Sequence, residues 1–183
     1  MKNTEKSIIF LIGMPAVGKS SFIASKGWDQ DPNTHIHSSD DVMMEWAEER
    51  GLTYDEAYKQ VDFFNEIVPI MLDRFNYAVK NDMNIVVDMV NATKGSRSHT
   101  FKMIDTDDFI VRAVVFGHEP WKAKDKKFFE KIVKAVNKRG REQNKNIPRD
   151  KLWKFMFSPY EEPTREEGFD QINFVDPLNP MVL

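Results

Sequence analysis

The chain has 183 residues, a hydrophobic content of 41% and no cysteine. This length is enough for one domain with a real hydrophobic core, and the composition is that of a globular chain rather than a disordered one. The lack of cysteine excludes disulfides, thiolate zinc sites and a cysteine nucleophile. No run of eighteen apolar residues occurs and the N-terminus lacks a cleavable signal pattern, so we expect a cytoplasmic protein with no membrane partner.

Charge is distributed unevenly along the chain. The net charge of −3 argues against a general nucleic-acid binder. Residues 119–154, however, contain thirteen Lys/Arg and five Asp/Glu, a net charge of +8, while the remainder carries −11. A basic segment on an acidic body suggests the handling of anions such as nucleotide phosphates or a nucleic-acid backbone. A solvated, lysine-rich helix face explains the segment equally well.

The first half of the chain reads as two strands, each followed by helical sequence. Residues 7–12 (SIIFLI) form a continuous apolar run that ends in glycine, which is typical of a buried parallel strand. Pro69 is expected to kink or divide the last helical stretch. In chain order, the expected elements are a strand at 7–12, a helix at 18–26, a strand at 34–37, and helices at 40–50 and 54–80.

The second half contains three further strands and a long basic helix. In chain order we expect strands at 84–88 and 109–116, a lysine-rich helix at 119–139 and a last strand at 171–175. Gly140 is expected to end the basic helix, Pro148 to open another, and residues 164–167 to form a capping box. Five strands alternating with helices predict a single α/β domain over 1–183, with a doubly wound, mostly parallel sheet flanked by helices and a basic lid at about 119–150.

The strongest functional signal is the segment GMPAVGKS at residues 13–20. It matches the pattern G-x-x-x-x-G-K-[ST] directly after an expected strand and directly before an expected helix. Backbone N–H groups of such a loop, with the start of the helix, bind phosphate. The pattern predicts a P-loop that binds ATP, with Lys19 on the β- and γ-phosphates and the Ser20 hydroxyl on Mg²⁺. The expected nucleotide-binding residues are Gly13, Pro15, Ala16, Val17, Gly18, Lys19, Ser20 and Ser21.

Carboxylates follow two of the expected strands, where parallel strands present functional groups. Asp40 and Asp41 follow the second strand, and Asp88 ends the third. Phosphoryl transfer often uses a carboxylate to accept the proton of the attacking hydroxyl. Either Asp40 or Asp41 could instead cap the next helix or lie in its first turn. We favour the helix role for Asp41 and the catalytic role for Asp40, and for Asp88 a structural role remains the alternative.

Two arginines close the basic helix. The planar guanidinium groups of Arg139 and Arg141 suit the oxygens of a transferring phosphate, and a segment that carries them could close over ATP. A surface charge cluster is the alternative. Two other groups of side chains are given structural roles: His35 and His37 lack a third metal ligand, and the aromatic residues at helical spacing are expected to be core. Those aromatic residues are Trp46, Tyr54, Tyr58, Phe63 and Phe64, and stacking on nucleic-acid bases is the alternative role for them.

Several motifs together resemble the 5′-hydroxyl polynucleotide kinases, a group of the adenylate-kinase-like P-loop kinases. The resemblance covers nearly the whole chain and includes the proline of the phosphate loop and the place of Asp40, where the family has its general base. Three further motifs are similar, of which the last is the most distinctive: Asp88-Met89-Val90-Asn91 followed by Ser96-Arg97, Asn137-Lys138-Arg139-Gly140-Arg141-Glu142, and Tyr160-Glu161-Glu162-Pro163-Thr164-Arg165-Glu166-Glu167-Gly168-Phe169.

This resemblance implies transfer of the ATP γ-phosphate to 5′-hydroxyl ends of DNA or RNA, in a nucleic-acid repair role. It implies that Asp40 activates the hydroxyl and that Lys19 and Arg139 stabilise the transferring phosphate. Mg²⁺ would be held by Ser20 and Asp88. The residues expected to bind or orient the substrate are Asp88, Asn91 and Arg97.

The chain departs from the family at two positions beside the expected base. Ser39 and Met43 stand where arginines help to hold the substrate's phosphate. This departure keeps open a kinase of another acceptor, either a small molecule or a hydroxymethylated base in DNA. A third possibility is an ATP-binding module that transfers nothing.

Overall fold

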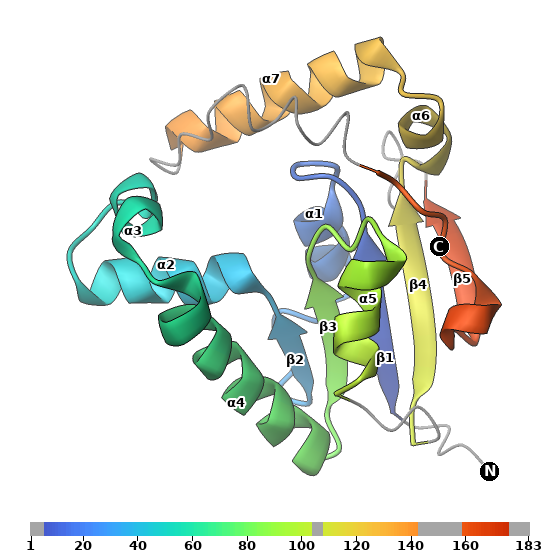
Figure 1. Ribbon diagram of the computed structural model, residues 1–183, viewed down its shortest axis with the longest axis horizontal. Helices are drawn as coiled ribbons and strands as arrows, with labels where there is room; N and C mark the ends of the chain where they lie inside the picture. Colours follow the sequence, from blue (N-terminus) through green and yellow to red (C-terminus); the bar gives the residue numbers. More distant parts are fainter. Residues whose placement is uncertain (1–5, 104–107, 143–158, 176–183) are drawn as a thin grey trace.

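The computed structural model describes residues 6–103, 108–142 and 159–175. Its centre is a five-stranded parallel sheet in the order β2-β3-β1-β4-β5 (Figure 1). The strands are β1 (Ser7–Ile12), β2 (Thr34–His37), β3 (Asn84–Asp88), β4 (Ile110–Phe116) and β5 (Gln171–Val175). The predicted α/β fold with a doubly wound parallel sheet is confirmed, and β4 begins one residue later than expected.

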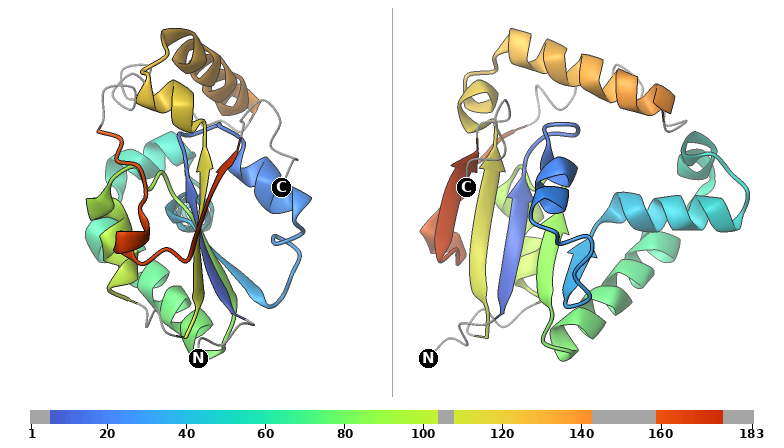
Figure 2. Two further views of the ribbon diagram at one scale, coloured as in Figure 1. Left: turned by 90° about the vertical axis from the view of Figure 1, so that its right-hand side faces the viewer. Right: turned by 180° about the vertical axis from the view of Figure 1, so that it is seen from behind.

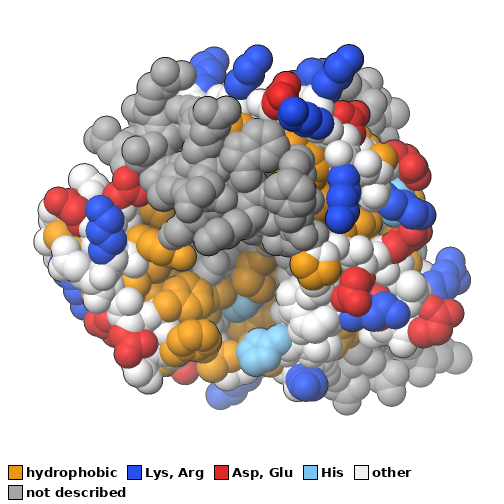
Figure 3. Space-filling model, turned by 45° about the horizontal axis from the view of Figure 1, so that its top comes forward, with side chains coloured by type: hydrophobic (Ala, Val, Ile, Leu, Met, Phe, Trp, Pro, Cys, Tyr) orange, Lys and Arg blue, Asp and Glu red, His pale blue; other side chains and the backbone are white. Residues whose placement is uncertain are grey.

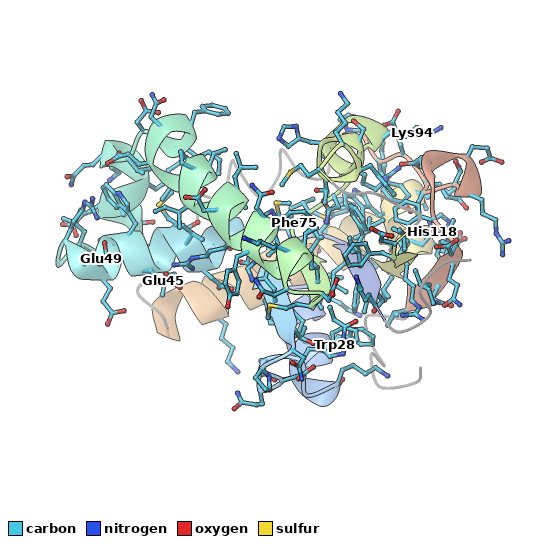
Figure 4. All side chains as sticks on the ribbon, turned by 90° about the horizontal axis from the view of Figure 1, so that it is seen from below. Trp28, Glu45, Glu49, Phe75, Lys94 and His118 are labelled. Carbon is cyan, nitrogen blue, oxygen red and sulfur yellow. The ribbon has the colours of Figure 1, made fainter. Side chains whose placement is uncertain are left out.

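Helices cover both faces of this sheet because its central strand is apolar on both sides (Figure 2). Alternate residues of β1 point to opposite faces. Ile8, Phe10 and Ile12 pack with α4 (Val68–Lys80), whose Phe75 lies against the sheet (Figure 4). Ile9 and Leu11 pack with α1 (Lys19–Ser25) on the other face. A fully buried strand of this kind is what a continuous apolar run predicts.

A second layer, here called the α2–α4 arm (residues 39–80), extends beyond the β2 edge. It consists of α2 (Ser39–Glu49), α3 (Tyr54–Gln60), the π-helical turn η1 (Phe63–Ile67) and α4. The arm has its own buried cluster, which includes Met43, Trp46 and Ile67. The helical stretch is divided beside Pro69 as expected, since η1 ends at Ile67 and α4 begins at Val68 with Pro69 in its first turn, where the missing N–H costs nothing. A second break, at Val61 and Asp62, was not expected.

The basic segment forms two helices rather than one. They are α6 (His118–Lys122) and α7 (Lys126–Glu142), and the Asp125 carboxylate accepts hydrogen bonds from the N–H groups of Lys127 and Phe128 to start the second. Gly140 does not end the helix, which continues to Glu142. α7 runs across the end of the sheet toward which the strands point (Figure 1). Pro148 lies outside the described residues.

Two shorter elements complete the fold. Sequence patterns did not predict α5 (Lys94–Phe101), a polar helix whose capping box joins Thr93 and Ser96. The expected capping box at Thr164 and Glu167 is present, and the turn it starts is the single 3₁₀ turn η2 (Arg165–Glu167). Among the helices in the described ranges, none is long and apolar enough to cross a membrane.

Candidate active site

The phosphate loop connects β1 to α1 at the C-terminal end of the central strand. Its backbone takes left-handed conformations at Ala16 (φ 60°) and Gly18 (φ 109°), the second of which glycine adopts without strain. Gly13 is needed for a different reason, because a Cβ there would lie 2.8 Å from the Val17 side chain and 3.0 Å from that of Phe116. No side chain caps α1 at Gly18, which leaves the first N–H groups of the helix available to an anion.

Lys19 and Asp88 meet above the ends of the two central strands. The Lys19 Nζ donates to the carbonyl oxygens of Gly13 (2.9 Å) and Met14 (3.3 Å), and lies 3.9 Å from Asp88 Oδ1. Asp88 pairs with Leu11 in the register of β1 and β3, so the sheet itself brings the carboxylate beside the loop. The structure therefore brings together residues predicted from two separate motifs: Lys19, which precedes Ser20 in the phosphate loop, and Asp88 at the end of β3.

Asp40 lies in the first turn of α2, directly after β2. The N-cap of α2 is Ser38, whose hydroxyl accepts a hydrogen bond from the Asp41 N–H at 3.2 Å. Capping therefore does not require Asp40. Its carboxylate is exposed rather than buried in the core, and Oδ1 accepts a hydrogen bond from the Tyr54 hydroxyl at 2.8 Å. Because β2 neighbours β3, Asp40 and Asp88 come from adjacent strand ends.

Tyr54 is a contact of the candidate base that sequence reasoning assigned only to the core. Burial, and then the charge of Asp40, raise the pKa of Tyr54 well above its ordinary value. The hydroxyl therefore stays protonated and donates to Asp40. A capping box between Thr53 and Glu56 fixes the start of α3, from which Tyr54 projects. In the sequence, Tyr54 and Asp40 are fourteen residues apart. This spacing does not indicate a contact, so the pair could not be predicted from the sequence.

Asn91 and Arg97 are buried and bind protein groups. The Asn91 side chain donates to the carbonyl oxygens of Leu11 (3.1 Å) and Val87 (3.3 Å), and so ties the end of β1 to β3. Arg97 donates to both carboxylate oxygens of Glu167 at 2.8 Å and to the carbonyl oxygens of Asn91 and Glu161 at 3.0 Å. Of the two predicted roles, these contacts favour orienting the site over touching the substrate.

The distinctive C-terminal motif has a structural explanation in the same contacts. Glu167 receives Arg97, the Glu161 carboxylate accepts from the Lys94 N–H at 2.6 Å, and Gly168 takes φ 111°. Phe169 packs edge-on against Phe10 at 5.3 Å. The motif therefore holds the chain between α5 and β5 in place. Because these residues stabilise the fold, their similarity to the family motif does not indicate which acceptor is phosphorylated.

The basic lid presents its lysines away from the sheet. Phe129, Ile132 and Val133 form the buried face of α7. Helical periodicity places four exposed lysines on the opposite face: Lys127, Lys131, Lys134 and Lys138. Arg139 and Arg141 have their backbone in the last turns of α7, and their side chains lie outside the described residues.

A parallel sheet in this order, with a glycine-lysine-serine phosphate loop between β1 and α1, defines a P-loop NTPase-like protein with a kinase-like fold. The comparisons agree. A family model described as an AAA domain, AAA_33, matches residues 8–152, and the chain belongs to that family. Nucleotide binding is what this fold and loop imply.

Solved structures with the same fold include a candidate kinase from Chloroflexus aurantiacus J-10-fl. The two share 11% identity with a TM-score of 0.62, over 99% of this chain and 90% of that one. A fungal RNA kinase is similar at 15% identity with a TM-score of 0.56, over 98% of this chain and 81% of that one. At these identities the likeness is one of fold. No curated protein matches the chain.

Proposed function

We propose that this protein is an ATP-dependent kinase that transfers the γ-phosphoryl group to a hydroxyl. The proposal rests on the distance of 3.9 Å between Lys19 Nζ and Asp88 Oδ1 beside the phosphate loop. An exposed Asp40 follows the neighbouring strand. Phosphoryl transfer needs a positioned nucleophile and neutralised charge more than covalent chemistry. The described residues supply a cation, a carboxylate beside it and a second carboxylate from an adjacent strand.

In this mechanism Lys19 exchanges the carbonyl oxygens of the loop for the β- and γ-phosphates of ATP. Asp40, held by Tyr54 through one oxygen, accepts the proton of the attacking hydroxyl through the other. Mg²⁺ is commonly held by one or two protein oxygens, phosphates and water, and the Ser20 hydroxyl and the Asp88 carboxylate fit as its donors. When bound there, Mg²⁺ would supply charge neutralisation at the phosphates. Arg139 and Arg141 are proposed as the phosphate contacts of the lid.

For the acceptor, the motif resemblance supports 5′-hydroxyl ends of DNA or RNA, and a fungal RNA kinase shares the fold. A second candidate is an acceptor other than a polynucleotide. It is supported by the burial of Met43, at a position where the polynucleotide kinases carry a phosphate-binding arginine.

Two variants test transfer itself, with γ-labelled ATP and three acceptors: a 5′-hydroxyl oligonucleotide, thymidine and phenylalaninol. Lys19→Ala is expected to weaken nucleotide binding and abolish transfer. Asp40→Asn is expected to keep nucleotide affinity, measured with a fluorescent ATP analogue, and to lower kcat by roughly 10²–10⁴-fold. Wild-type turnover in Asp40→Asn would contradict the proposed base and favour a nucleotide-binding module.

A further inference from the structure

The α2–α4 arm, which carries the candidate base, is strongly acidic. Residues 39–80 contain ten Asp/Glu and four Lys/Arg, a net charge of −6. Two of the four cations have partners on the arm. Arg74 binds both carboxylate oxygens of Glu45, at 3.1 and 2.5 Å, and Arg50 lies 4.0 Å from the centre of the Trp46 ring. Figure 4 shows Glu45 on α2, on the far side of the molecule from Lys94 and His118.

The same arm exposes most of the large hydrophobic side chains found at the surface of the described residues. Tyr58 is 52% exposed and Phe64 is 79% exposed, although their helical spacing predicted core positions. Met44, Ile70 and Tyr77 also lie on the arm, and Phe174 on β5 is the one large exposed hydrophobic in the described ranges outside it. Figure 3 shows hydrophobic side chains gathered in the region between the arm and α5.

One of the exposed rings, Tyr58, adjoins the candidate site. The Tyr54 ring, whose hydroxyl binds Asp40, stacks on Tyr58 with 6.4 Å between ring centres. At the other end, Met89 follows Asp88 in sequence and packs against the arm's buried cluster. An acceptor with its hydroxyl at Asp40 would therefore lie against aromatic and methionine side chains.

Among the side chains that the structure describes, neither α2 nor the outward face of α7 supplies the cations that a polynucleotide would need beside Asp40. Met43, at the position of a phosphate-binding arginine in the resembled family, is 2% exposed in the core of the arm. The four lysines of α7 lie opposite its buried face, so they point away from the sheet end that carries the phosphate loop. Phosphates that approached Asp40 along the arm would meet carboxylates.

We infer that the acceptor is a small alcohol with an aromatic or apolar body and no negative charge, which docks on the α2–α4 arm through Tyr58 and Phe64. This inference rests on the proposed transfer reaction and names its substrate class. The net charge of −6 on the arm disfavours phosphate groups and suits a neutral or cationic acceptor, and the exposed rings supply stacking and apolar contact. A single-stranded nucleic acid is the opposite outcome of the test.

Three acceptors that share the 5′-hydroxyl of a thymidine and carry increasing numbers of phosphates form a series: thymidine, thymidine 3′-phosphate and 5′-hydroxyl oligo(dT). We expect kcat/KM to fall along this series, by about threefold or more at the first phosphate at low salt, because like charges repel most when screening is weak. Phenylalaninol, which is aromatic and cationic, is expected to be phosphorylated. A rise in kcat/KM toward the oligonucleotide would overturn the inference.

Two substitutions of exposed aromatic residues test whether the acceptor binds on the α2–α4 arm. Tyr58→Ser and Phe64→Ser are each expected to raise the KM for thymidine about tenfold, as loss of stacking does, with the KM for ATP unchanged. Phe174→Ser is the matched control, since Phe174 is an exposed aromatic on β5. Equal effects of all three substitutions, or no effect of any, would place the acceptor elsewhere.

A binding measurement separates this inference from the transfer reaction. Fluorescence polarisation of labelled 5′-hydroxyl oligo(dT), with Mg-ADP present, reports acceptor charge preference even when no phosphate is transferred. Kd above about 10 µM at low salt supports the inference, whereas a lower Kd that weakens steeply with salt overturns it. Failure to transfer phosphate to any acceptor, with the oligonucleotide still binding weakly, would instead count against the proposed kinase reaction.

Discussion

At the scale of single residues, the site combines one cation and two carboxylates with different surroundings. Lys19 and Asp88 are mostly buried beside the loop, with side-chain exposures of 10% and 17%. Asp40 is exposed and held by Tyr54. A carboxylate held through one oxygen keeps a defined orientation, and orientation is a large part of what phosphoryl transfer requires. Tyr54 is therefore a positioning residue for the proposed base.

Removal of the Tyr54 hydroxyl tests this role. Tyr54→Phe keeps the ring in the arm's core and is expected to lower kcat about tenfold, with little change in the KM for ATP, because Asp40 loses its fixed orientation. Steady-state kinetics with varied ATP and acceptor measure the split. Tyr77→Phe, an exposed tyrosine of α4, is the control. A kcat equal to wild type in Tyr54→Phe would show that the hydrogen bond only joins α2 to α3.

At the scale of elements, a buried ion pair ties α5 to the segment before β5. The Arg97 side chain is 0% exposed and that of Glu167 is 11% exposed. Arg97 also holds the carbonyl oxygens of the loop after β3 and of Glu161, so one guanidinium joins three segments. The loop after β3 carries Asn91, which binds the ends of β1 and β3. The motif at residues 160–169 thereby stabilises the C-terminal end of the sheet, where the phosphate loop lies.

The exposed pair of Arg74 and Glu45 can be compared with the buried pair of Arg97 and Glu167, because both are bidentate Arg–Glu pairs. Arg97→Met is expected to reduce the free energy of unfolding by about 3–5 kcal/mol, because it leaves the Glu167 carboxylate buried without a partner. Arg74→Met breaks the exposed pair with Glu45 and is expected to cost about 1 kcal/mol or less. Urea denaturation measures both. Equal losses from the two variants would contradict the role assigned to burial.

At the scale of the whole molecule, an apolar sheet covered on both faces carries charge of opposite sign on its two extensions. The acidic arm lies beyond β2, and α7 crosses the C-terminal end of the sheet (Figures 1 and 2). The exposed lysines of α7 lie opposite its buried face. Where the arm joins the sheet, His37 is buried, and its ring packs edge-to-face with the ring of Phe75, with 4.9 Å between the ring centres. Desolvation there, and then the nearby His35, lower the pKa of His37 to about 4.

The low pKa makes global stability depend on pH in a defined window. The unfolded chain binds a proton at His37 near pH 6.5, whereas the folded chain resists it until about pH 4. Stability is therefore complete above pH 6.5 and falls by roughly 3 kcal/mol as the pH drops to about 4. Urea unfolding across this range, with His37→Gln compared with wild type, measures the contribution. His99→Gln, on the exposed side of α5, is the control, and an unchanged slope in His37→Gln would contradict the assignment.

Local sequence pattern predicted the strands and the phosphate loop well. β1, β3 and β4 are short, mostly apolar runs, and the residues of the phosphate loop lie within eight positions. Helix boundaries depend on partners that the pattern does not show. The chain breaks at Asp62 as well as before Pro69, and Gly140 stays helical within α7. α5 has too few apolar residues to show the helical period, and its burial rests on Arg97 and Thr100.

The sequence by itself determined that this chain builds a parallel α/β sheet with a nucleotide-binding loop, because continuous apolar runs mark buried strands and the residues of the loop lie within eight positions. Only the tertiary structure decided which charges and rings surround the candidate base. It turned the α7 lysines outward, placed Arg97 inside an ion pair with a glutamate seventy residues away, and left Tyr58 and Phe64 exposed. Such placements arise from packing between distant segments, and no local pattern encodes them.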